Sequence, residues 1–154
     1  MNLFRKTIPW ILTLLLMISI FYLSHQSAEE SKDLSNKTEK VIIDILNKII
    51  PGDSIEINIV SHTIRKSAHF FLYFLMGILI RDGLRNMGIN GWRALALAMT
   101  ICILYAISDE VHQLFIVGRS GELRDVFIDG SGSLVGIFIY NIGYYITGLV
   151  NKKR

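Results

Sequence analysis

The stretch YAISDEVHQLFIVGRSGELRDVFID, residues 105–129, decides how this chain folds. An apolar run ends in Asp109 and Glu110, a short Gly-Arg-Ser-Gly turn follows at 118–121, and a second apolar run begins around Asp129. Ionisable side chains at the edge of a bilayer are costly to bury, so a group of them between two apolar runs indicates a functional site. The stretch therefore predicts two membrane-spanning helices joined at a polar site.

Four apolar runs divide the 154-residue chain, whose hydrophobic content of 51% and mean hydropathy of +0.44 are high for a soluble protein. The runs 7–23 and 130–150 carry no charge and are long enough to cross a membrane. The uncharged runs 67–80 and 94–108 are shorter than the roughly 20 residues that a spanning helix needs, so their helices should extend into the flanking polar residues. The sequence predicts an all-α polytopic membrane protein, a single domain over 1–154 with spans at about 7–24, 64–81, 93–109 and 128–149.

The first run also fits the start of a signal peptide, because it follows the basic residues Arg5 and Lys6. However, residues 24–27 offer no small-x-small cleavage site, and the run is longer than the usual apolar core of a signal peptide. We therefore expect a retained first span.

The segment of about 25–63 is the extended polar part of the chain. Between 34 and 50 its apolar residues recur every three and four positions, which predicts an amphipathic helix that Pro51 and Gly52 stop. Such a helix would lie on the bilayer surface or cover the polar site. A solvated spacer with one apolar face is the equal alternative.

Charge is distributed unevenly between the two ends of the predicted bundle. Four spans place both termini on one side, where Asp82 is the one acidic residue beside the basic residues Arg5, Lys6, Arg81, Arg85, Arg93, Lys152, Lys153 and Arg154. The positive-inside rule therefore predicts a multi-pass cell-membrane protein with cytoplasmic N- and C-termini and an extracytoplasmic polar cluster. Basic residues do not gather on one amphipathic face, so we expect no nucleic-acid partner.

Polar residues from three predicted spans should meet on the outer side. Arg65, His69 and Tyr73 are spaced by four residues and form one stripe on a helix. Asp109 and His112 are three residues apart, so the carboxylate can orient the imidazole and raise its basicity. The candidate catalytic residues are His69, Asp109 and His112. The candidate ligand-binding residues are Arg65, Lys66, Tyr73, Glu110, Gln113, Arg119, Asp125 and Asp129.

Other polar or small residues are assigned simpler roles. Gly132 and Gly136 form a small-xxx-small pair that lets a neighbouring helix approach closely. His25 and His62 are expected to be solvated, and Ser24 to cap the end of the first span, with a wider role as a minor alternative. Cys102, the single cysteine, is expected to be a buried, inert thiol.

Four roles for the polar cluster remain open. A histidine beside a carboxylate can act as general acid and base, or the cluster can bind a polar head group without chemistry. A metal bound by His69, His112, Asp109 and Asp125 or Asp129 is a weaker alternative, because no HExxH or CxxC motif is present; we expect no metal and no cofactor. The fourth role is a polar network that only holds the helices together. The residues do not decide whether the protein is an enzyme.

The motifs resemble those of the VanZ-like family. They are Arg65-Lys66-Ser67-Ala68-His69 with Tyr73, Ser108-Asp109-Glu110-Val111-His112-Gln113-x-Phe115, Gly118-Arg119-Ser120-Gly121, Asp125-x-x-x-Asp129, and Ser24-x-Gln26-Ser27 after the first span. The resemblance covers about residues 8–148, and the combination of motifs is specific. Gly130-Ser131 departs from the asparagine or threonine that the family pattern leads us to expect after Asp129.

The resemblance implies a small multi-pass membrane protein of bacteria. The founding member of the family is associated with low-level resistance to teicoplanin, a glycopeptide antibiotic with a lipid tail. We therefore expect the partners to be membrane lipids, with a lipid-linked cell-wall precursor or a lipoglycopeptide as ligand. The expected function is to bind or act on this amphiphile, in envelope function or in glycopeptide resistance.

Overall fold

The computed structural model describes residues 3–26 and 57–152, and all four elements of this part are helices. They are α1 (Leu3–His25), α3 (Ile57–Asn86), α4 (Gly91–Gln113) and α5 (Leu123–Lys152). Each contains one span that is long and apolar enough to cross a membrane. The prediction of an all-α protein with four spanning helices is confirmed. The amphipathic helix predicted at 34–50 lies outside the described residues.

Each helix is longer than its predicted span, because the helices continue into polar residues. Helix α4 was expected to end near residue 109 but runs to Gln113, so Asp109 and Glu110 lie inside its last two turns. Helix α3 begins at Ile57, before the expected start near residue 64. Both short apolar runs are thus completed by flanking polar residues, as expected from their lengths.

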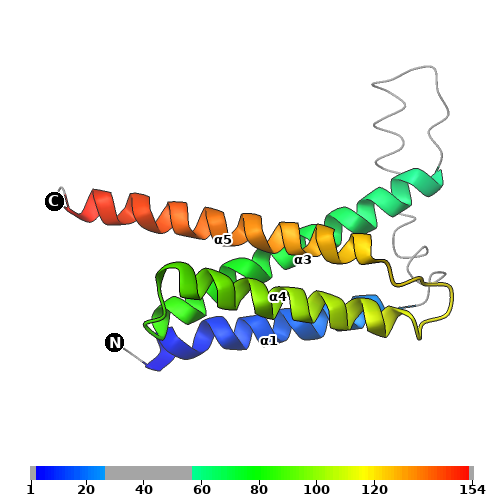
Figure 1. Cartoon of the computed structure of the whole chain (residues 1–154), viewed down its shortest axis with the longest axis horizontal. Helices are drawn as coiled ribbons and strands as arrows, with labels where there is room; N and C mark the ends of the chain where they lie inside the picture. Colours follow the sequence, from blue (N-terminus) through cyan, green and yellow to red (C-terminus); the bar gives the residue numbers. More distant parts are fainter. Residues whose placement is uncertain (1–2, 27–56, 153–154) are drawn as a thin grey trace, which may run out of the picture.

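Helix α3 is at the centre of the bundle and packs against α1, α4 and α5, most extensively against α5 (Figure 1). The start of α1 and the end of α5 lie at one end of the bundle. At the opposite end, α1 and α4 finish and α5 begins. We call this the loop end, because it contains the α4–α5 loop, residues 114–122.

Small side chains form the buried face of α4. Ala94, Ala98, Cys102 and Ala106 recur every four residues and are fully buried, and the same face continues into Asp109. Large apolar side chains point outward on all four helices, for example Ile18, Phe71, Leu104 and Phe138. Small residues inside and large apolar residues outside are the pattern of helices that pack within lipid.

Glycines bring α3 and α5 close together. A methyl group on Gly132 would collide with the backbone oxygen of Phe70, and one on Gly136 with that of Phe74. Gly77, on α3, is similarly close to the backbone of Ser133. The predicted close approach at Gly132 and Gly136 is therefore confirmed, and it aligns Asp129 on α5 with the polar residues of α3.

Candidate functional site

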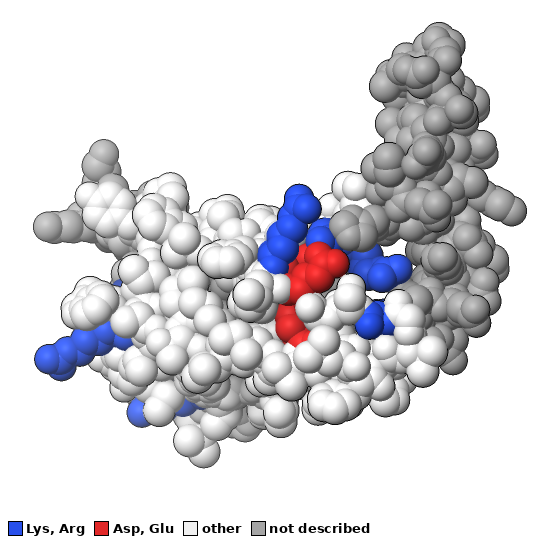
Figure 2. All heavy atoms as spheres, turned by 45° about the vertical axis from the view of Figure 1, so that its right-hand side comes forward, with Lys and Arg blue, Asp and Glu red and all other residues white. Residues whose placement is uncertain are grey.

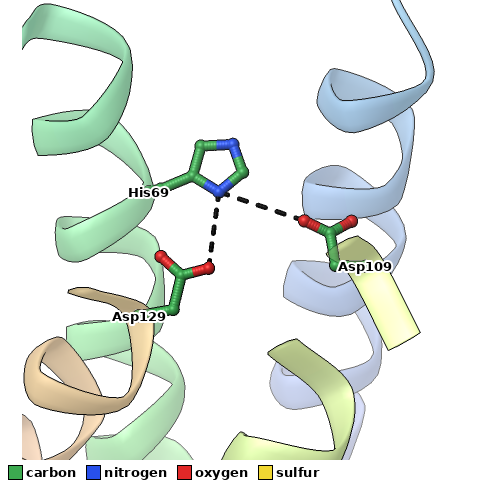
Figure 3. A group of neighbouring side chains, drawn as sticks. All are labelled: His69, Asp109 and Asp129. Atoms are coloured by element: carbon green, nitrogen blue, oxygen red, sulfur yellow. Dashed lines mark ion pairs between the residues drawn. The ribbon is translucent and has the colours of Figure 1, made fainter. Parts of the chain in front are cut away.

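Two buried carboxylates and a partly buried imidazole, from three helices, meet near the loop end (Figure 3). Nδ1 of His69 on α3 lies 3.7 Å from Oδ2 of Asp129 on α5 and 4.0 Å from Oδ2 of Asp109 on α4. Both carboxylate side chains are 1% exposed, and the imidazole is 15% exposed. Helix packing, not local sequence, creates this group, since its members are at least 20 positions apart in the chain.

Asp109 is held by two further polar side chains. Ser24 on α1 donates a hydrogen bond of 2.9 Å to its Oδ2, and Gln113 Nε2 donates one of 3.3 Å to the same oxygen. Ser24 is fully buried. All four helices therefore contribute to the environment of the Asp109–His69–Asp129 group.

Lys66 lies one turn before His69 on α3 and pairs with acids of α5 and the preceding loop. Its Nζ is 2.6 Å from Oδ1 of Asp125 and 3.7 Å from Oε2 of Glu122. Glu110 accepts a 2.8 Å hydrogen bond from the backbone N–H of Glu122. These contacts fix the start of α5 against α3 and α4.

Arg119 ties the α4–α5 loop to the end of α1. Its Nε donates to the backbone carbonyl of Gln26 at 2.8 Å, and its Nη2 donates to that of Leu23 at 3.0 Å. The last carbonyls of a helix lack partners within the helix, and a guanidinium satisfies them well. Burial, with a further contribution from nearby Arg65, lowers the pKa of Arg119 from its ordinary value. Within the described residues Arg119 forms no ion pair.

His112 belongs to a different contact group. Its Nε2 lies 3.2 Å from Nδ1 of His25, and its ring stacks on Phe21 with 4.4 Å between centroids. The pairing of Asp109 with His112, predicted from their spacing, is not formed. Asp109 points into the bundle, whereas His112, most of a turn further along α4, lies against α1. His25 is exposed, as expected for a solvated side chain, and it is also the neighbour of His112.

Tyr73 lies deeper than His69 on the same stripe of α3. It is fully buried, and its ring is 6.5 Å from the imidazole of His69 and 6.1 Å from the ring of Tyr105. Tyr73 therefore supports His69 from below and does not line the pocket described next.

A pocket of about 120 Å³ opens at the loop end above the buried group. Figure 2 shows acidic side chains on one face of the molecule with lysine and arginine side chains around them. Of the residues predicted from the sequence, the pocket is lined by Arg65, Lys66, His69, Glu110, Gln113, Arg119, Asp125 and Asp129. Asp109, Tyr73 and His112 lie outside this lining.

The comparison with family models gives one match, VanZ/LLP1, over residues 9–144. The chain belongs to the VanZ/LLP1 family. The match covers most of the chain: it contains α4 and α3 and the larger parts of α1 and α5. No curated protein and no solved structure matches the chain.

Membership in the VanZ/LLP1 family, together with four apolar helices, shows that this is a multi-pass membrane protein. The resemblance drawn from the sequence motifs is thereby confirmed. Those motifs contribute both buried and pocket-lining residues, so the family pattern coincides with the loop end of the bundle.

The sequence did not reveal that Ser24 contacts Asp109. We expected it to cap α1, but it donates to a carboxylate 85 positions away. The signal was present, since Ser24-x-Gln26-Ser27 is part of the family pattern. Its meaning depends on α1 lying beside α4, which local spacing does not indicate.

Proposed function

We propose that this VanZ-like protein binds an amphiphile at the outer face of the cell membrane. The polar head enters the pocket at the loop end, and the apolar tail stays in the bilayer. The candidate ligands are a lipid-linked envelope precursor and a lipoglycopeptide antibiotic of the teicoplanin type. The first role serves the envelope, and the second would contribute to resistance.

One observation carries this proposal: a polar pocket and an apolar groove share their wall. A groove of about 140 Å³ between the end of α4 and the start of α5 is lined mainly by Ile107, Val111, Leu114, Leu123 and Val126. Glu110 and Glu122 line both the groove and the polar pocket. A ligand with a polar head and an apolar tail fits such a pair of adjoining sites, whereas a wholly polar ligand would leave the groove unused.

The charges of the pocket favour a head group that carries both an anion and hydrogen-bond donors. Within the described residues Arg65 takes part in no ion pair, and Arg119 contacts only backbone carbonyls. A phosphate or carboxylate of the ligand can bind these two guanidinium groups. Hydroxyl or amino groups of the same head can donate to the carboxylates of Glu110 and Asp129.

Lipid binding by the full chain in mild detergent tests this proposal. Native mass spectrometry with a polyprenyl phosphate or teicoplanin should show saturable binding, and phosphatidylcholine should bind weakly. Arg65→Gln should weaken binding of the polyprenyl phosphate by about 10-fold, as expected for one lost charge-assisted contact. The matched control is Arg93→Gln, an exposed arginine at the other end of the bundle. Equal losses in the two variants, or equal binding of phosphatidylcholine, would contradict the proposal.

An enzyme acting on the same head group is the second candidate, and the His69–Asp129 pair favours it. A carboxylate 3.7 Å from an imidazole that lines a pocket is a suitable general acid–base arrangement. For a hydrolase or transferase, His69→Asn should abolish turnover of the bound lipid while lipid binding survives. For a binding protein, the same substitution should reduce affinity, and the lipid should be recovered unchanged from the wild type.

A further inference from the structure

We propose that His69, Asp109 and Asp129 bind a divalent transition-metal ion, of the Zn²⁺ or Mn²⁺ type, at the floor of the pocket. The sequence led us to expect no metal, because no short segment contains a metal-binding motif. In the structure the three donors come from three different helices, so a local motif is not needed. The inference concerns ion binding alone and does not depend on the identity of the lipid.

The donor atoms are spaced for one ion. One nitrogen or oxygen from each of the three residues lies within 4.8 Å of the others. Donors about 2.0–2.2 Å from a tetrahedral ion are roughly 3.4 Å apart, and the two distances from His69 Nδ1 are 3.7 and 4.0 Å. Side-chain movements of at most about 1.4 Å, the difference between 4.8 Å and roughly 3.4 Å, would complete the coordination.

The oxygens of Asp129 supply a second, independent observation. The side chain is 1% exposed, and neither of its oxygens has a hydrogen-bond partner among the described residues. Oδ1 of Asp109 is also buried without a hydrogen-bond partner in this part of the chain. Buried carboxylate oxygens are costly unless something binds them. Oδ2 of Asp129 and Oδ2 of Asp109 are the oxygens directed at Nδ1 of His69 (Figure 3), so an ion would lie between these three atoms.

Charge balance also favours a divalent cation. Two buried carboxylates, Asp109 and Asp129, face one imidazole. The nearest lysine, Lys66, is paired with Asp125 and Glu122 instead. An ion of charge +2 would neutralise both carboxylates while His69 binds it in its neutral form.

The surroundings resemble those of established metal sites. Ser24 and Gln113 donate hydrogen bonds to Asp109, and such outer contacts orient metal ligands and raise their affinity. His69 and Asp129 line the pocket, so an ion has a path of entry. Three protein ligands leave at least one coordination position open toward the pocket. One imidazole and two carboxylates form a mixed set that suits Zn²⁺ or Mn²⁺.

The test measures ion binding by the purified full chain. Protein stripped with a chelator is titrated with Zn²⁺ and, separately, with Mn²⁺, and the bound ion is counted by elemental analysis. We expect one ion per chain and a rise in the unfolding temperature on binding. Co²⁺ should give the visible absorption bands of a low-symmetry site. Asp129→Asn should weaken binding by at least about 10-fold.

Asp82→Asn is the control, because it removes the same charge from a carboxylate at the other end of α3, where Asp82 accepts hydrogen bonds from Tyr140 and Asn86. It should leave ion affinity within about twofold, as expected for a carboxylate outside the pocket. If Asp129→Asn does not fold, His69→Gln replaces it, and the unfolding temperature of the wild type with and without ion still decides. No stoichiometric ion and no change in unfolding temperature would overturn the site. Equal losses in Asp82→Asn and Asp129→Asn would also overturn it, because they would show that only general negative charge attracts the ion.

Discussion

At the scale of single residues, Asp109 connects three of the four helices. It accepts hydrogen bonds from Ser24 on α1 and Gln113 on α4 and lies within ion-pair distance of His69 on α3. A buried carboxylate with several partners specifies one helix arrangement, because any other arrangement leaves it unpaired. Asp109 therefore specifies the helix arrangement at the place where we propose that an ion binds.

Ser24→Ala should destabilise the protein by about 1–3 kcal/mol, because it removes a hydrogen-bond donor from a buried carboxylate. Ser19→Ala is the control: its hydroxyl, on the same helix, donates only to the backbone carbonyl of Leu15 and is exposed. Unfolding in detergent, followed by circular dichroism, measures both variants. Equal stability of the two would mean that the Ser24–Asp109 bond contributes nothing net.

At the scale of secondary-structure elements, the contact between α3 and α5 positions the site. Glycines allow the two backbones to touch. This contact fixes the position of α5 along α3 and therefore the level at which Asp129 lies beside α3. The α4–α5 loop is positioned separately, through the contacts of Arg119 with the end of α1.

Gly136→Ala should weaken the α3–α5 contact by about 1–3 kcal/mol, because its methyl group meets the backbone oxygen of Phe74 rather than a movable side chain. Gly143→Ala lies on the same helix with no atom within 4 Å of the added methyl group, so it should be neutral or slightly stabilising through helix propensity. Unfolding temperatures in detergent compare the two. An unchanged unfolding temperature for Gly136→Ala would show that α3 and α5 can move apart to accept the methyl group without loss of stability.

Arg119→Lys should loosen the α4–α5 loop, because one ammonium group cannot reproduce two contacts made by separate nitrogens of a planar guanidinium. Hydrogen exchange over residues 114–122 should increase by about 10-fold, as expected for roughly 1.4 kcal/mol of lost local stability. Arg124→Lys, an exposed arginine at the start of α5, is the control and should change little. If both variants exchange like the wild type, the contacts of Arg119 do not hold the loop.

At the scale of the whole molecule, polarity is inverted relative to a water-soluble bundle. Large apolar side chains cover the outside, and the charged cluster lies at one end between the helices. Lipid can solvate the outside, but it cannot solvate the carboxylates, which explains why they gather where four helices and a loop enclose them.

The proposed orientation predicts which loops an impermeant thiol reagent reaches in intact cells. Ser120→Cys, in the α4–α5 loop, should react, whereas Met87→Cys, after α3, should react only when the cells are opened. Both positions are exposed, and Met87 avoids the positive φ of Gly88. Wild-type protein is the control, since Cys102 is buried. The opposite labelling pattern would place the pocket in the cytoplasm and contradict an outer-leaflet ligand.

Apolar run length and short motifs were enough to predict the four spanning helices, the family and eight of the residues that line the pocket. Gly118, Ser120, Glu122 and Ile128 also line it but were not among the candidate site residues. These properties are encoded locally, because a span needs a certain length of uncharged chain and a motif keeps its spacing. The small-xxx-small pair Gly132 and Gly136 belongs here too, as its spacing alone indicates a close helix contact.

The packing of the helices decided which polar side chains contact each other. Among the histidines, His112 is the closest to Asp109 in the sequence, yet Asp109 contacts Ser24 and lies near His69, and His112 contacts His25. Spacing along one helix indicates which residues share a face. Which neighbouring helix that face contacts depends on the packing of the whole bundle. For the same reason the sequence predicted that polar residues of three spans would meet, whereas folding decided that His69, Asp109 and Asp129 form the group and that His112 lies beside His25.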